Sequence, residues 1–138
     1  MTGRCYCGAS VVEARGAPLA ISYCHCQDCR RVTGAPVAAF AAFPKGSVDV
    51  TPEIAPICAH QGVRRWSCPT CGSPMLAAFD YLDGQVYVPL GILDNADVLA
   101  PQLHSHADAC LPWLKLDDDL PREPASARDR LNARTDAP

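Results

Sequence analysis

The chain has 138 residues, 49% of them hydrophobic and 20% charged, and its formal net charge is −3 at pH 7. This length and composition are typical of one globular domain with a hydrophobic core. The acidic balance excludes a basic nucleic-acid-binding surface, and no apolar stretch is long enough to span a membrane, so we expect neither kind of partner.

Short apolar runs separated by turn-forming residues fill most of the sequence. Gly16-Ala17-Pro18, Gln61-Gly62 and Leu82-Asp83-Gly84 are typical turns, and no apolar period of 3.6 residues is sustained anywhere. We therefore predict an all-β fold. In chain order, the expected strands and apolar runs lie at 9–15, 19–23, 35–43, 48–51, 57–60, 63–67, 76–81 and 85–88, with one helical turn at 26–32.

The character of the sequence changes after Leu116. Asp117-Asp118-Asp119, three prolines and many charged residues follow, and such a composition lacks the apolar side chains of a core. We expect a single domain over residues 1–124 and an irregular, disordered tail over residues 125–138.

Nine cysteines in so short a chain indicate either disulfides or bound metal. The N-terminal residues form no apolar signal region, so we expect a cytoplasmic protein, in which thiols stay reduced and clustered cysteines bind metal. Seven of the nine lie in three tight clusters, which are Cys5-x-Cys7, Cys24-x-Cys26-x-x-Cys29 and Cys68-x-x-Cys71.

The seven clustered thiols divide into a set of four and a set of three. Zinc takes four protein ligands in structural sites, and three ligands plus an open position in catalytic sites. Cys5 and Cys7 supply two ligands, and with Cys68 and Cys71 they would complete a closed site of four thiolates. We therefore predict two zinc ions per chain, of which the one in the closed site stabilises the fold.

Cys24, Cys26 and Cys29 lie within six residues, so their sulfurs can face one ion and leave its fourth position free. His25 lies between two of these cysteines, and we expect its side chain to point away from their common target. Asp28 is a harder oxygen donor and is less suited to a thiolate-rich site. The three cysteines are therefore the candidate catalytic residues.

The charge of three thiolates favours one kind of ligand at the open position. A zinc ion held by three thiolates carries excess negative charge, which makes it a weak activator of water. A soft site suits another sulfur, so the sequence predicts that a small thiol binds there as a thiolate. Arg30 and Arg31 follow the cluster directly, and we expect them to bind the carboxylates of that thiol.

The remaining cysteines and histidines belong to no cluster. Cys58 and Cys110 stand alone in the sequence, and lone cysteines are mostly small, buried, hydrophobic residues. We expect His60, His104 and His106 to be structural or surface residues rather than metal ligands.

The order of these motifs resembles that of a known family. Gly3-x-Cys5-x-Cys7-Gly8 comes first, then Cys24-His25-Cys26-x-x-Cys29-Arg30, and then Arg65-x-x-Cys68-Pro69-x-Cys71-Gly72. The arrangement is similar to that of the glutathione-dependent formaldehyde-activating enzyme family, which also contains the centromere protein V domain. The resemblance extends over roughly residues 3–122, and all seven clustered cysteines match it.

The resemblance implies an all-β zinc fold of coiled sheets, sometimes called a β-tent. It implies a structural zinc on Cys5, Cys7, Cys68 and Cys71, and a second zinc on Cys24, Cys26 and Cys29. It also implies a zinc-dependent carbon–sulfur lyase that condenses glutathione with formaldehyde to S-(hydroxymethyl)glutathione. The expected partner is then a small-molecule thiol, with glutathione as the candidate.

Two other functional classes remain open on the sequence alone. The first is a non-catalytic zinc module that binds a protein partner. In that case an internal ligand, such as His25 or Cys58, would close the second metal site. The second class is an iron–sulfur or rubredoxin-like electron carrier, which would be coloured.

Overall fold

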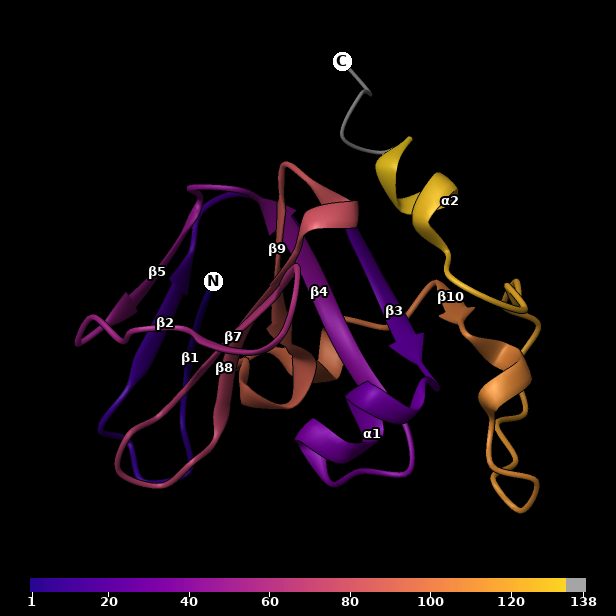
Figure 1. Ribbon diagram of the computed structural model, residues 1–138, viewed down its shortest axis with the longest axis horizontal. Helices are drawn as coiled ribbons and strands as arrows, with labels where there is room; N and C mark the ends of the chain where they lie inside the picture. Colours follow the sequence, from indigo (N-terminus) through magenta and orange to yellow (C-terminus); the bar gives the residue numbers. More distant parts are fainter. Residues whose placement is uncertain (134–138) are drawn as a thin grey trace.

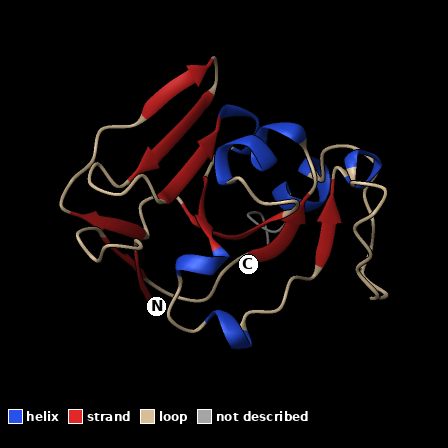
Figure 2. Cartoon of the chain, turned by 90° about the horizontal axis from the view of Figure 1, so that it is seen from below, coloured by secondary structure: helices blue, strands red, loops and turns tan. Residues whose placement is uncertain are grey.

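The computed structural model describes residues 1–133, and strands and loops make up most of this part of the chain (Figure 1, Figure 2). None of its helices is long and apolar enough to cross a membrane. The strands are β1 (Thr2–Arg4), β2 (Val11–Ala14), β3 (Ala20–Cys24), β4 (Ala38–Pro44), β5 (Val48–Thr51), β6 (Ile57–His60), β7 (Val63–Ser67), β8 (Pro74–Phe79), β9 (Gln85–Pro89) and β10 (Leu103–Ser105). The helices are α1 (Gln27–Thr33) and α2 (Arg128–Asn132), with short 3-10 turns η1 (Asp80–Leu82), η2 (Leu90–Ile92), η3 (Ala96–Val98) and η4 (Ala107–Ala109).

The strands form two sheets. A three-stranded sheet has the order β1-β2-β5, and a seven-stranded sheet has the order β10-β3-β4-β9-β8-β7-β6. Strands β10 and β3 pair in parallel, whereas the other paired strands are antiparallel. The chain is therefore a mostly β, single-domain protein with few helices, as the sequence predicts.

Strand β4 lies between two hydrophobic clusters, because alternate residues of a strand point to opposite faces of its sheet. Phe40 packs in the cluster that contains Cys29. Phe43, which is fully buried, packs in the cluster that contains Cys68. Burial on both faces explains why the sequence of this strand is a continuous apolar run. It also places the two groups of clustered cysteines in different parts of the core.

Most of the expected elements are present, and the exceptions are short. The strands expected at 48–51, 57–60 and 63–67 coincide with β5, β6 and β7, and the helical turn expected at 26–32 corresponds to α1. Strands β1 and β10 are not among the expected elements. Each has three residues, which is too few to show an alternating pattern, and β10 pairs with a strand about 80 residues earlier in the sequence.

The segment expected to be a disordered tail is partly helical. Helix α2 lies within 125–138, and Ala127 and Leu131, one helical turn apart, are both buried. This corrects the expectation for residues 125–133, since two apolar residues at helical spacing give this segment a small contact surface with the core. The rest of the expected tail, 134–138, lies outside the described residues.

Candidate metal centres

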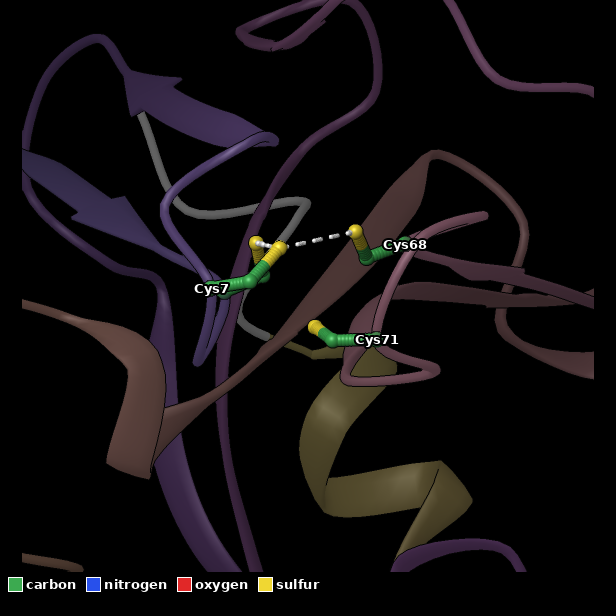
Figure 3. A group of neighbouring side chains, drawn as sticks. Cys7, Cys68 and Cys71 are labelled. Carbon is green, nitrogen blue, oxygen red and sulfur yellow. Dashed lines mark hydrogen bonds between the residues drawn. The ribbon is translucent and has the colours of Figure 1, made fainter.

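Four cysteine thiols from two distant turns meet in the structure. Cys5 and Cys7 lie between β1 and β2, and Cys68 and Cys71 lie between β7 and β8. The four Sγ atoms all lie within 4.8 Å of one another. In Figure 3, the sulfurs of Cys7, Cys68 and Cys71 are turned toward a common centre. The fold therefore brings together the four thiols that the sequence assigns to one site.

Each of the two turns that carry these thiols is closed by a backbone hydrogen bond from a glycine to the first cysteine of its pair. In the first turn, the amide of Gly8 donates to the carbonyl oxygen of Cys5 at 3.1 Å. In the second, the amide of Gly72 donates to the carbonyl oxygen of Cys68 at 2.8 Å. The two glycines have φ angles of 80° and 79°, a conformation that costs glycine no steric strain. Each turn thereby aims two sulfurs in one direction.

The spacing of the four thiols fits a tetrahedral zinc ion. With zinc–sulfur bonds of about 2.3 Å, the sulfurs of such a site lie about 3.8 Å apart. Cys7 Sγ lies 3.5 Å from Cys5 Sγ and 3.9 Å from Cys68 Sγ. The Ser73 hydroxyl, 3.2 Å from Cys71 Sγ, lowers the pKa of that thiol to about 5. This favours the thiolate form that metal binding requires.

The other three clustered cysteines lie where β3 leads into α1. Cys24 ends β3, Cys26 is the N-cap of α1, and Cys29 lies in its first turn. The Cys29 amide donates to Cys26 Sγ at 3.3 Å, so the sulfur replaces the serine or aspartate oxygen found at many helix N-termini. The three Sγ atoms lie within 4.8 Å of one another, and no fourth potential ligand joins them among residues 1–133.

The electrostatics of this second cluster also favour a bound cation. Hydrogen bonds with Cys24 and Cys29 lower the pKa of the Cys26 thiol, whereas hydrogen bonds with Cys24 and Cys26 raise the pKa of Cys29. One thiol can therefore ionise at the expense of its neighbours, because adjacent thiolates repel one another. A soft metal ion would allow all three to ionise together.

His25 is directed away from the three cysteines. It is 2% exposed, and its Nε2 atom lies 2.8 Å from His104 Nδ1, with the two rings stacked. His104 Nε2 lies 3.0 Å from the carboxylate of Asp118, which also accepts a hydrogen bond from Arg122 at 2.9 Å. Neither histidine belongs to a cysteine cluster, so the structure places both where the sequence expects them, outside the metal sites.

This network ties the cysteine-bearing loop to the C-terminal part of the chain. Burial lowers the pKa of His25, with a further contribution from His104, so the His25 ring is neutral at pH 7. Arg122 lowers the pKa of Asp118 to about 2. Because a carboxylate can only accept hydrogen bonds, His104 donates to it from Nε2. The network thus holds the orientation of the residue between Cys24 and Cys26.

A cavity of about 140 Å³ adjoins the three-cysteine cluster. Its wall combines the three sulfurs with aromatic and charged groups. These are the aromatic side chains Phe40, Phe79, Tyr81 and Tyr87 and the charged side chains Asp28 and Arg65. Burial raises the pKa of Tyr81 to about 12, so its hydroxyl stays protonated at neutral pH and can donate a hydrogen bond into the cavity.

Arg65 is the arginine that lies beside the three-cysteine cluster. Its Nη2 atom is 4.0 Å from Cys29 Sγ, and its guanidinium lies over the ring of Phe79 at 5.4 Å from the centroid. It extends from β7, where its neighbour Arg64 pairs with Asp80 instead. Sequence alone offers no reason to choose Arg65 over Arg64, and only the direction of the side chains in the folded strand separates them.

Arg30 and Arg31, the arginines expected to bind a thiol, lie elsewhere. They line a shallow hollow together with Gly34 and Leu111, and neither lines the cavity beside the cysteines. Their assignment as ligand-binding residues stays a prediction. Arg65, which belongs to the other basic pair of the sequence, is the arginine that lines the cavity.

The unclustered cysteines and histidines differ in their surroundings. Cys58 is exposed on β6, so the expectation that it is a buried hydrophobic residue is wrong, because every residue of this edge strand is exposed. Cys110 is half-buried. His60 is exposed, as expected of a surface residue. His106, in the left-handed conformation with φ 52°, lines the cavity beside the cysteines.

The chain matches a family model and is similar to a solved structure. The model of the family described as glutathione-dependent formaldehyde-activating enzyme matches residues 1–109. A crystal structure of a Rhodobacter sphaeroides protein, a structural genomics target, is 26% identical in sequence with a TM-score of 0.53. The similarity covers 69% of this chain and 89% of the Rhodobacter chain. A search of curated proteins found no match.

Proposed function

Because the chain belongs to the glutathione-dependent formaldehyde-activating enzyme family, we propose that it joins a small thiol to an aldehyde and catalyses the reverse cleavage. The family supplies glutathione and formaldehyde as the candidate pair. In the forward direction a carbon–sulfur bond forms, the carbonyl π bond breaks, and the thiol proton ends on the carbonyl oxygen. The product is S-(hydroxymethyl)glutathione. The observation that carries the proposal is a cluster of three thiols on the wall of a cavity.

We assign two zinc ions to each chain. The cluster of Cys5, Cys7, Cys68 and Cys71 has the four ligands of a structural site, and the cluster of Cys24, Cys26 and Cys29 has the three of a catalytic site. A zinc ion held by three thiolates would lower the pKa of a thiol bound at its remaining position. The donor sets support zinc because sulfur ligands at these separations suit a soft, tetrahedral ion.

The cavity provides groups that would hold the two reactants. Arg65 places a cation beside the sulfur cluster, where it can pair with a carboxylate of the thiol or with the developing alkoxide. The Tyr81 hydroxyl, which stays protonated, can donate to the aldehyde oxygen and so polarise the carbonyl group.

The alternative of a closed zinc module that binds a protein partner has less support. It requires an internal fourth ligand at the second cluster, and His25 and Cys58 are the candidates. His25 binds His104 instead, and Cys58 lies exposed on β6. Within residues 1–133, neither joins the three cysteines.

The role of Arg65 gives the test of this proposal. We expect Arg65→Gln to lower kcat/KM for glutathione and formaldehyde by about tenfold or more, because a charge-assisted contact made in the cavity is lost. NMR exchange spectroscopy can measure the interconversion of free and thiol-bound formaldehyde above the uncatalysed rate. Arg64→Gln, on the same strand but paired with Asp80, is the matched control and should retain full activity.

Two results would contradict this account. Wild-type protein that does not accelerate the exchange would contradict the proposed activity. A larger loss in Arg31→Gln than in Arg65→Gln would show that the anion-binding role belongs to the pair expected from the sequence.

A further inference from the structure

Helix α2 forms part of the wall of the cavity beside the three cysteines. Ser126, Ala127 and Leu131 line this cavity, and the last two are only 3% and 5% exposed. These residues follow the part of the chain that the family model matches, residues 1–109. The family match therefore accounts for the cysteines and the aromatic wall, but not for the helix that covers the space beside them.

With α2 in this position the cavity is small. Its volume is about 140 Å³. Pockets that enclose drug-sized ligands are typically about 300–1,000 Å³. Glutathione is a tripeptide of that size class, so the cavity can admit a thiol of a few atoms but cannot enclose a whole tripeptide. The side chain of Leu131 is the largest apolar group that α2 contributes to the wall.

The segment before α2 is firmly attached to the body of the protein. The amide of His104 donates to the carbonyl oxygen of Pro121 at 2.8 Å, and the amide of Glu123 donates back to His104 at 2.9 Å. The amide of His106 donates to the carbonyl oxygen of Ala125 at 2.8 Å. This segment is therefore joined to β10 by an isolated β-bridge between His104 and Arg122, and to the residues after β10 by further backbone hydrogen bonds.

Helix α2 packs against η1 and is also linked to β9. The Nε2 atom of Gln85 on β9 donates to the carbonyl oxygen of Leu131 at 2.9 Å, and the Tyr87 hydroxyl donates to Gln85 Oε1 at 2.6 Å. Arg130 pairs with Glu123, so this ion pair lies within the C-terminal segment itself. A helix of five residues has few backbone hydrogen bonds of its own, so it can be displaced while the preceding segment stays in place.

We propose that α2 is a lid that determines which thiols reach the three-cysteine site, and that Leu131 is its specificity-determining residue. With the lid closed, the site accepts small thiols. A glutathione-sized thiol binds only when α2 is displaced, so its affinity is reduced by the fraction of molecules in which the lid is open. This inference rests on the proposed function, because it concerns access to the same thiol-binding site.

Leu131→Ala in the full-length, zinc-loaded protein tests this proposal by isothermal titration calorimetry with glutathione and with 2-mercaptoethanol. We expect the variant to bind glutathione at least about fivefold more tightly than wild type does, and to bind 2-mercaptoethanol within about twofold of wild type, because only the larger ligand requires the open lid. Leu114→Ala, half-buried in the same C-terminal region but not lining this cavity, is the matched control. It should leave the ratio of the two affinities unchanged.

Hydrogen exchange in wild-type protein provides a second measurement that does not depend on how well Leu131→Ala folds. The amides of α2 should exchange faster when glutathione is bound than when 2-mercaptoethanol is bound. Equal exchange in the two complexes, or an unchanged affinity ratio in a folded Leu131→Ala protein, would overturn the lid while leaving the proposed function intact. Failure of both thiols to bind wild-type protein would overturn both.

Discussion

Replacing Cys68 by serine should leave the chain unfolded or insoluble. Cys68 is buried at 2% exposure, and its cluster joins the turn between β1 and β2 to the turn between β7 and β8, more than 60 residues apart. Structural zinc sites contribute on the order of 10 kcal/mol of apparent binding energy, which is comparable with the whole stability of a small domain. Soluble yield and thermal melting monitored by circular dichroism would measure the loss.

The control for this variant is Cys58→Ser. Cys58 is exposed on the edge strand β6 and belongs to neither cluster, so its replacement should leave yield and melting temperature unchanged. A soluble Cys68→Ser protein with the melting temperature of wild type would contradict the structural role of the four-cysteine cluster.

Replacing Cys26 by serine should remove the second metal and abolish thiol binding while the fold persists. The cluster of Cys24, Cys26 and Cys29 is local, so it closes no long loop. Serine at an N-cap also accepts a hydrogen bond from the backbone, so α1 should still form. Elemental analysis should find two zinc ions per wild-type chain and one per variant chain, with a melting temperature within a few degrees of wild type.

The comparison between Cys26→Ser and Cys68→Ser tests how the two sites divide their roles. Strand β4 separates the hydrophobic cluster around Cys29 from the one around Cys68, so a change in one site should affect the other little. Unfolding of Cys26→Ser as complete as that of Cys68→Ser would show that both sites hold the fold.

The sequence predicts which cysteines meet in the fold because their spacing is short. A turn of two to four residues leaves little freedom in where two sulfurs point, so Cys68-x-x-Cys71 predicts its own geometry. The pairing of this turn with Cys5-x-Cys7 rests on counting ligands, and the structure confirms that the four lie together. Assigning four of the seven clustered cysteines to the first site leaves Cys24, Cys26 and Cys29 as a group of three, and the structure brings these three together.

The spacing of residues in the sequence does not predict which side chains reach the cavity from distant strands. Arg65 and Arg64 are neighbours on β7, and alternation predicts that they point to opposite faces but not which face meets the cysteines. The burial of Leu131 likewise depends on Gln85 and the aromatic wall, which lie far away in sequence. A lone cysteine such as Cys58 carries no periodic signal, so its exposure depends on the edge position of β6.

We expect the three-cysteine site to accept a thiol sulfur and the four-cysteine site not to. Titration of cobalt-substituted protein with glutathione and with S-methylglutathione, followed by the sulfur-to-cobalt charge-transfer absorption, tests this expectation directly. Glutathione should increase this absorption in wild type but not in Cys26→Ser, and S-methylglutathione should have no effect, because it cannot form a thiolate. An equal response to glutathione and its S-methyl analogue, or an unchanged spectrum with both, would contradict it.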